Sequence, residues 1–182
     1  MSEDVCSADH AGWCTIPLRR LWTDPGRILR GLVDEGQTVA DLGCGPGFFT
    51  LPMARMVGPH GRVIAVDLQA EMLAKLKVRA ERASLDSRIH LHQCFADSLG
   101  ELPPLDFALA FFMVHEVPDP ARLLGEVTGA LREGGRLLLV EPNGHVNAAA
   151  FGETVKLAQA AGLEPVGEPR VRFSRARLFV AR

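Results

Sequence analysis

The stretch VADLGCGPGFFT, residues 39–50, decides the fold. It opens with apolar residues and carries an acid at Asp41. Three glycines then follow two residues apart, at Gly43, Gly45 and Gly47. Glycine permits a sharp turn and, because it lacks a Cβ, lets a ligand approach the backbone closely. The following residues can form a helix, whose first N–H groups lack partners within the helix. A strand, a glycine-rich turn and a helix predict a ligand site at the carboxyl end of that strand.

Length and composition favour one globular domain. The chain has 182 residues, of which 47% are hydrophobic, and this content is enough to bury a full core. We expect residues 1–182 to form a single domain, with residues 1–23 as an N-terminal arm or lid. The net charge of −2 gives no reason to expect a nucleic-acid partner.

The sequence also bears on location. No apolar run reaches the roughly 18 residues that span a bilayer, so we expect no membrane partner. The acidic N-terminus, MSEDVCSADH, lacks the apolar core of a secretory signal. A cytoplasmic protein is therefore expected, in which cysteines are free thiols rather than disulfides. The four cysteines are Cys6, Cys14, Cys44 and Cys94.

Apolar runs alternate with amphipathic segments along the chain. This alternation predicts an α/β protein with a doubly wound, mostly parallel sheet and helices on both faces. The expected strands are residues 38–42, 62–66, 89–93, 106–112, 136–140, 163–166 and 173–181. The expected helices are residues 25–33, 48–56, 70–83, 120–132 and 147–161. Gly134 and Gly135 are expected to end the fourth of these helices, and the last two strands are expected to form an antiparallel hairpin at one edge.

Two kinds of ligand use such a glycine turn with an acid after the second strand: dinucleotides and S-adenosylmethionine. In the dinucleotide fingerprint the third glycine falls three residues after the second, whereas Gly47 falls two after Gly45. Asp41 suits a cationic amino group and does not suit a pyrophosphate at a helix N-terminus. Asp67, at the end of the second strand, suits the two hydroxyls of a ribose. The spacing and Asp41 together favour S-adenosylmethionine.

With these motifs, residues 24–182 resemble the class I S-adenosylmethionine-dependent methyltransferases, of the small-molecule type that includes the ubiquinone and menaquinone methyltransferases. The matching segments are VADLGCGPGFF, VIAVDLQAEML, DFALAFFMVHEVPD and LREGGRLLLVEP. The resemblance implies a seven-stranded sheet in the order 3-2-1-4-5-7-6, with strand seven antiparallel. It implies S-adenosylmethionine as methyl donor, S-adenosylhomocysteine as product and a small-molecule acceptor.

The resemblance also implies where the methyl donor binds. Asp67 would hold the ribose, Leu68 would lie beside the adenine, and Asp97 would lie near the adenine amino group. The backbone near Phe111 would face the methionine part. The full set of expected cofactor-binding residues is Asp41, Gly43, Cys44, Gly45, Gly47, Phe48, Asp67, Leu68, Met72, Ala96, Asp97 and Phe111.

Methyl transfer is an in-line displacement that needs a base only when the acceptor must lose a proton. His115 and Glu116, after the fourth strand, are the catalytic candidates. The alternative is that His115 packs against its turn and that Glu116 is a solvated acid. Glu141 and His145, after the fifth strand, face the same edge, so with His115 they are candidates for contacts with the acceptor. The alternative, which the sequence favours, is that Glu141 and His145 form a satisfied pair within their loop.

Three further features leave alternatives open. Trp13 is a candidate substrate contact on a lid that would exclude water. Cys6, His10 and Cys14 have donors for a soft metal or metalloid, but three donors on a loose arm favour no metal site. Four arginines between residues 170 and 177 either steer an anionic substrate or cover a solvated edge strand. Two other functions stay open: a non-catalytic S-adenosylmethionine-binding or partner-binding module, and an NAD-dependent oxidoreductase.

Overall fold

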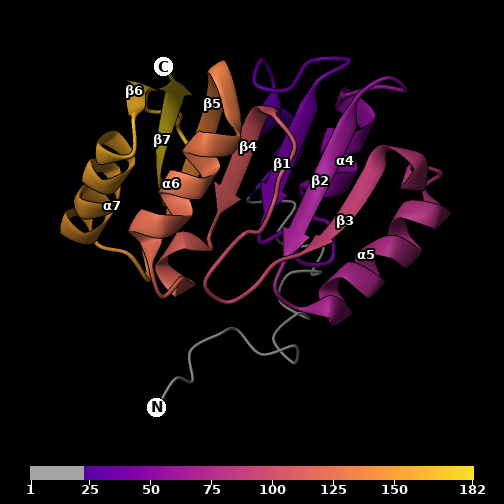
Figure 1. The fold of residues 1–182 in the computed structure, drawn as a ribbon, viewed down its shortest axis with the longest axis horizontal. Helices are drawn as coiled ribbons and strands as arrows, with labels where there is room; N and C mark the ends of the chain where they lie inside the picture. The colour runs from indigo at the N-terminus through magenta and orange to yellow at the C-terminus, as the bar shows by residue number, and fades with distance from the viewer. Residues whose placement is uncertain (1–22) are drawn as a thin grey trace.

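The computed structural model of the chain describes residues 23–182, which form a central sheet with helices on both faces (Figure 1). The seven strands lie in the order β3-β2-β1-β4-β5-β7-β6, and β7 runs antiparallel to both of its neighbours. The remaining neighbouring pairs are parallel. The expected fold class and strand order are therefore confirmed.

Most strands and helices lie close to their expected positions. The strands are β1 (Thr38–Leu42), β2 (Arg62–Asp67), β3 (Ile89–Gln93), β4 (Leu105–Phe111), β5 (Leu131–Pro142), β6 (Leu163–Gly167) and β7 (Ser174–Ala181). The helices are α3 (Pro25–Leu29), α4 (Thr50–Met56), α5 (Ala70–Arg82), α6 (Pro120–Ala130) and α7 (Ala148–Ala160), with short 3₁₀ turns η2 (Asp86–Arg88) and η3 (Val114–Glu116).

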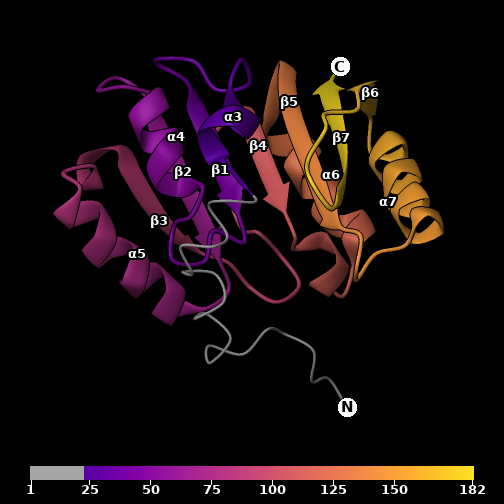
Figure 2. The same ribbon diagram turned by 180° about the vertical axis from the view of Figure 1, so that it is seen from behind.

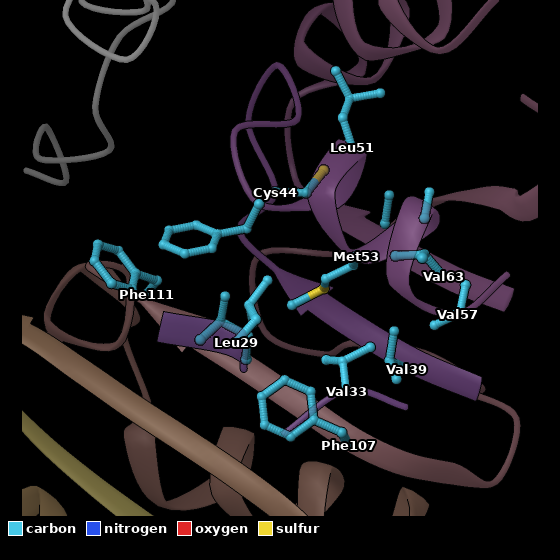
Figure 3. Packing of buried hydrophobic residues seen from close by; sticks show 14 of the residues in the cluster. Leu29, Val33, Val39, Cys44, Leu51, Met53, Val57, Val63, Phe107 and Phe111 are labelled. Carbon is cyan, nitrogen blue, oxygen red and sulfur yellow. The ribbon is translucent and has the colours of Figure 1, made fainter. Parts of the chain in front are cut away.

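The two faces of the sheet carry separate apolar clusters, because successive side chains of a strand point to opposite faces. Val39, Val63 and Phe107 belong to the cluster under α3, α4 and α5, where Figure 3 shows them together with Met53 of α4. Their neighbours in the strands join the other cluster, under α6 and α7. Figure 2 shows α3 and α4 on the face opposite α6. Burial on both faces explains why the central strands β2 and β4 are apolar along most of their length.

Side-chain caps begin three of the helices. Asp24 Oδ1 accepts the N–H groups of Gly26 (2.9 Å) and Arg27 (3.3 Å), and Pro25 takes the first helical position of α3. Asp119 does the same for α6 through the Arg122 N–H, at 3.0 Å. Asn147 caps α7 and is not itself helical. Such caps satisfy N–H groups that the helix leaves unpaired.

Two helices are shorter than expected at one end. α3 ends at Leu29 rather than at residue 33, because Arg30 leaves the helical conformation with a ψ of 123° and Gly31 has a φ of 74°. The guanidinium of Arg136 binds the carbonyl oxygens of Gly31 and Leu32, at 3.0 Å each. Leu32 and Val33 are buried nonetheless. α4 begins at Thr50 rather than at residue 48, because the glycine turn extends through the two phenylalanines before it.

The expectation that Gly134 and Gly135 end a helix is wrong. α6 ends at Ala130, and β5 begins at Leu131 and includes both glycines. A Cβ on Gly135 would lie 2.8 Å from the carbonyl oxygen of Arg132 and 3.0 Å from that of Leu105. The two glycines therefore lie in the irregular first part of β5, where the register with β4 shifts, and do not end a helix.

The hairpin at the edge is confirmed, but the interpretation of its arginines as part of an edge strand is wrong. β7 lies between β5 and β6, and the edge strands of the sheet are β3 and β6. Edge strand β6 carries Pro165, which cannot donate a backbone hydrogen bond to a further strand.

Within residues 23–182, no helix combines the length and the apolar character that a membrane crossing requires. The single-domain organisation stays a prediction, as does the N-terminal arm or lid, most of which lies outside the described residues.

The internal position of β7 makes a prediction about stability. Phe179 on β7 is fully buried, so Phe179→Ala should lower the free energy of unfolding by about 3–5 kcal/mol. Val166→Ala on edge strand β6, where the side chain is 53% exposed, should change it by less than about 0.5 kcal/mol. Urea unfolding followed by circular dichroism measures both values. Equal effects would mean that β7 does not carry core packing.

Candidate active site

The glycine turn follows β1 and packs between two other elements. Gly43, Gly45 and Gly47 all have positive φ, at 67°, 51° and 88°. A Cβ on Gly47 would lie 2.4 Å from Leu76 Cδ1 of α5, and one on Gly43 would lie 3.0 Å from Met113 Cβ. A Cβ on Gly45 would meet nothing within 4 Å. Gly43 and Gly47 thus allow close packing of the protein, whereas Gly45 borders open space.

Asp67 joins the turn to the end of β2. Its Oδ2 accepts the Gly45 N–H at 2.8 Å, and its Oδ1 accepts the Gln69 N–H at 2.9 Å, just before α5. The residue is 8% exposed, and this burial raises the pKa of Asp67 although the two N–H donors lower it. The carboxylate is thereby held in one orientation beside the open face of Gly45.

Asp41 lies deeper, at 3% exposed, near the end of β1. Its Oδ2 accepts the hydroxyl of Thr50 at 2.5 Å. Thr50 is the fully buried first residue of α4, so this bond ties the strand to the helix beneath the turn. Thr50 was not among the site residues expected from the sequence. Its hydroxyl, at the start of a helix that follows an acidic strand end, could have indicated the bond to Asp41.

Helix α5 supports the turn from the side. Arg79 Nη1 donates to the carbonyl oxygen of Pro46 at 2.5 Å, and Leu76 packs against Gly47 as described. Met72, one turn earlier on the same helix, is buried at 6% exposed. Arg79 was not among the expected site residues, because its contact with a residue 33 positions earlier leaves no local pattern.

Cys44 fills space within the turn and belongs to the apolar cluster drawn in Figure 3. Its N–H donates to the Val66 carbonyl at 2.9 Å and extends the contact between β1 and β2. Burial raises the pKa of the Cys44 thiol well above its usual value, and the nearby carboxylates of Asp41 and Asp67 raise it further. Cys94, after β3, is also a free thiol whose pKa burial raises.

Four phenylalanines form a row from the turn to the end of β4. Ring centroids are 5.2 Å apart between Phe48 and Phe49, 4.4 Å between Phe49 and Phe111, and 4.2 Å between Phe111 and Phe112. Phe112 has a φ of 61°, which L-residues rarely adopt. This conformation interrupts the alternation of β4, so that both Phe111 and Phe112 pack on the face of α3 and α4. The row gives one wall of the site an aromatic lining.

His115 and Glu141 are in direct polar contact at this edge of the sheet. Glu141 Oε2 lies 2.6 Å from His115 Nδ1, and Glu141 Oε1 accepts the backbone N–H of His115 at 3.2 Å. Glu141 is 1% exposed, and burial raises its pKa although His115 lowers it. A carboxylate at Nδ1 favours a proton on that nitrogen and leaves Nε2 as the basic nitrogen of the neutral ring.

Glu116 and His145 complete this cluster. The ring of His145 meets that of His115 edge-on, with centroids 5.7 Å apart. Glu116 Oε1 lies 3.9 Å from His115 Nε2. Burial raises the pKa of Glu116, and Asp67 raises it further while both histidines lower it.

The residues after β3 are exposed and less well gathered. Ala96 is exposed, and the side chain of Asp97 is 78% exposed, with Oδ2 3.6 Å from Arg122 Nη1 of α6. Leu68, after β2, is partly buried. A contact of Asp97 with an adenine amino group therefore stays a prediction.

Several expected residues lie outside the described part of the chain: Trp13 and the possible metal donors Cys6, His10 and Cys14. Within residues 23–182, no group of three or more histidine, cysteine, aspartate or glutamate side chains is arranged to hold a metal ion.

Residues 33–164 match the family model for the methyltransferase domain, so the chain belongs to the class I S-adenosylmethionine-dependent methyltransferase family. The fold agrees with a solved S-adenosylmethionine-dependent methyltransferase from Aquifex aeolicus, with a TM-score of 0.84, 23% identity, and coverage of 97% of this chain and 100% of that one.

Two curated relatives match in sequence. The chain is 34% identical over 118 residues to trans-aconitate 2-methyltransferase of Azoarcus sp., covering 65% of this chain and 44% of that protein. It is 36% identical over 108 residues to the ubiquinone biosynthesis O-methyltransferase of Xylella fastidiosa, covering 58% of this chain and 42% of that protein. The chain thus matches less than half the length of either relative.

The two N–H bonds to Asp67 predict an effect that needs no ligand. In Asp67→Asn one oxygen becomes an amide NH₂, so either the Gly45 or the Gln69 N–H loses its acceptor. The free energy of unfolding should fall by about 1–3 kcal/mol. The same substitution at exposed Asp86 should change it by less than about 0.5 kcal/mol. Urea unfolding of the unliganded proteins provides the measurement, and equal stability of Asp67→Asn and wild type would contradict it.

Proposed function

We propose that this protein transfers a methyl group from S-adenosylmethionine to a small-molecule acceptor. The observation that carries this function is the hydrogen bond of the glycine turn, through Gly45, to Asp67, with buried Asp41 below. The family match and the names of the two relatives support the same activity.

The residues around the turn fit the methyl donor. Each carboxylate oxygen of Asp67 accepts one N–H and has capacity for a second donor, which suits two ribose hydroxyls. The open space beside Gly45 allows a ligand to approach the backbone. Asp41 offers buried negative charge for the ammonium group of the methionine part. When bound, S-adenosylmethionine supplies a methyl group on a positively charged sulfur.

In this function His115 is the general base for an acceptor that must lose a proton. Glu141 holds the ring through Nδ1 and the backbone N–H, which orients Nε2 and stabilises the imidazolium that forms on proton uptake. The aromatic row from Phe48 to Phe112 keeps water away from one side. The alternative that His115 only packs against its turn does not require a buried carboxylate on its ring.

Binding of S-adenosylhomocysteine tests the cofactor half of the site. Isothermal titration should detect binding to the wild type, with a loss of at least about tenfold in Asp67→Ala because the hydroxyl acceptors are removed. Gly45→Val should also abolish binding, because its side chain would fill the open space of the turn. The exposed variant Asp86→Ala is the control. No binding to the wild type at millimolar concentration would rule out this function.

Kinetics tests the base. With an acceptor found by screening turnover, His115→Gln should lower kcat by about 10²–10⁴-fold, and Glu141→Gln by less, because the ring remains but loses its orientation. S-adenosylhomocysteine affinity should be unchanged, and an acceptor that is already ionised should recover most of the rate. His60→Gln, an exposed histidine before β2, is the control. An equal loss with ionised and neutral acceptors would show that His115 has only a structural role.

A further inference from the structure

A cavity of about 390 Å³ lies between the loop after β6 and the first half of β7. Its lining includes three arginines, Arg170, Arg175 and Arg177, and one acid, Glu168. This volume falls within the range of small-molecule sites. The lining therefore carries an excess of positive charge in a protein whose net charge is −2.

The cavity exists because the two strands of the hairpin differ in length. β6 pairs with β7 only from Gly167 opposite Leu178 to Leu163 opposite Ala181. The first residues of β7, 174–177, extend beyond the end of β6, and residues 168–173 loop around them, as Figure 2 shows. The side chains of Arg175 and Arg177 alternate with Ala176 and so share one face of β7.

Arg177 has an unsatisfied buried donor. Its Nη1 lies 2.5 Å from Glu168 Oε1, but its Nε is buried and has no hydrogen-bond partner among residues 23–182, where it is the single buried side-chain nitrogen or oxygen in that state. Buried donors are nearly always paired, and guanidinium groups pair best with carboxylate and phosphate oxygens. Arg177, whose Nε lacks a partner, lines the cavity together with Arg170 and Arg175, and such a cluster of guanidinium groups is typical of an anion site.

Arg175 links the cavity to the segments that carry the histidine cluster. Arg175 lies opposite Glu141 in the β5–β7 register, and Glu141 holds His115. Arg175 Nη1 also binds Asn143 Oδ1 (2.6 Å) and the Val146 carbonyl (2.7 Å), on either side of His145. β4 and β7 are separated by two strand spacings, about 10 Å, so one elongated small molecule can reach both His115 and the arginines.

We propose that this cavity binds the carboxylate or phosphate group of the methyl acceptor, whose reacting atom lies at His115. The identity of the ligand as the acceptor rests on the proposed function, whereas binding of an anion in the cavity can be measured without methyl transfer. Arg170 and Arg177 are the residues that contact the anion, and Arg175 positions the loop of His145.

The first experiment titrates the full chain with inorganic phosphate by NMR, at constant ionic strength kept with chloride. Arg170→Met and Arg177→Met should each weaken phosphate binding by about tenfold or more. Arg182→Met is the matched control, since Arg182 is an exposed arginine that is also paired with a glutamate, Glu164, and does not line the cavity. Arg170 is exposed on the loop, so its removal keeps the test valid if Arg177→Met fails to fold.

The second experiment asks whether the anion belongs to the acceptor. Acceptors are screened in pairs of a carboxylate and its neutral primary amide. The carboxylates should have the lower KM, Arg170→Met should remove this preference with little change in kcat, and phosphate should compete with the acceptor.

Three results would overturn the proposal: equal phosphate affinity in wild type and both variants, equal use of carboxylates and amides, or phosphate binding that leaves the KM of the acceptor unchanged. The last result would mean that the cavity binds an anion that is not part of the acceptor. Failure of S-adenosylhomocysteine to bind would instead reject the proposed function, and the phosphate titration would still report on the cavity.

Discussion

The hydrogen bond from the Gly45 N–H to Asp67 joins the two strand ends on which the site depends. A buried carboxylate is stable only when donors compensate its lost hydration, and here the donors are backbone N–H groups of two different turns. The carboxylate therefore orients both turns at once. It holds the glycine turn beside the end of β2 and, through Gln69, the entry of α5. α5 in turn contacts the glycine turn through Leu76 and Arg79, so the turn and the helix hold each other in position.

The second half of the site depends on a break in regular structure. Along β4 the side chains alternate between the two apolar clusters until Phe111, and the positive φ of Phe112 ends this alternation. The chain then turns through η3 and brings the His115 backbone and ring to Glu141. Strain of this kind persists where the surroundings determine the conformation. Here the Phe112 N–H donates to the Val140 carbonyl, and the ring packs on Phe111.

Local chemistry made most of the fold predictable. The apolar runs and the glycine turn act within a few residues, and each lies where the sequence indicated. Contacts across the sheet could not be predicted. Gly135 looks like a helix terminator until the Leu105 carbonyl is placed beside it. His115 and Glu141, 26 residues apart, were expected at one edge, but their direct bond depends on a β4–β5 register that shifts after Leu105. The arginines of β7 were wrongly assigned to an edge strand, because composition does not show which strand is outermost. The order of the strands in the sheet decides this.

The half of the site around Asp67 and the half around His115 depend on different features of the fold. The half proposed to bind the methyl donor uses backbone N–H groups and two acids at the ends of adjacent parallel strands, an arrangement that the strand–turn–helix pattern specifies almost completely. The half proposed to bind the acceptor is assembled from the ends of β4, β5 and β7, whose side chains meet only because β7 enters the sheet antiparallel beside β5. That insertion aligns Arg175 with Glu141 and leaves the start of β7 uncovered by β6. Selectivity for the acceptor can therefore change through the length of the β6–β7 loop and its charges, while Asp67 and the glycine turn stay as they are.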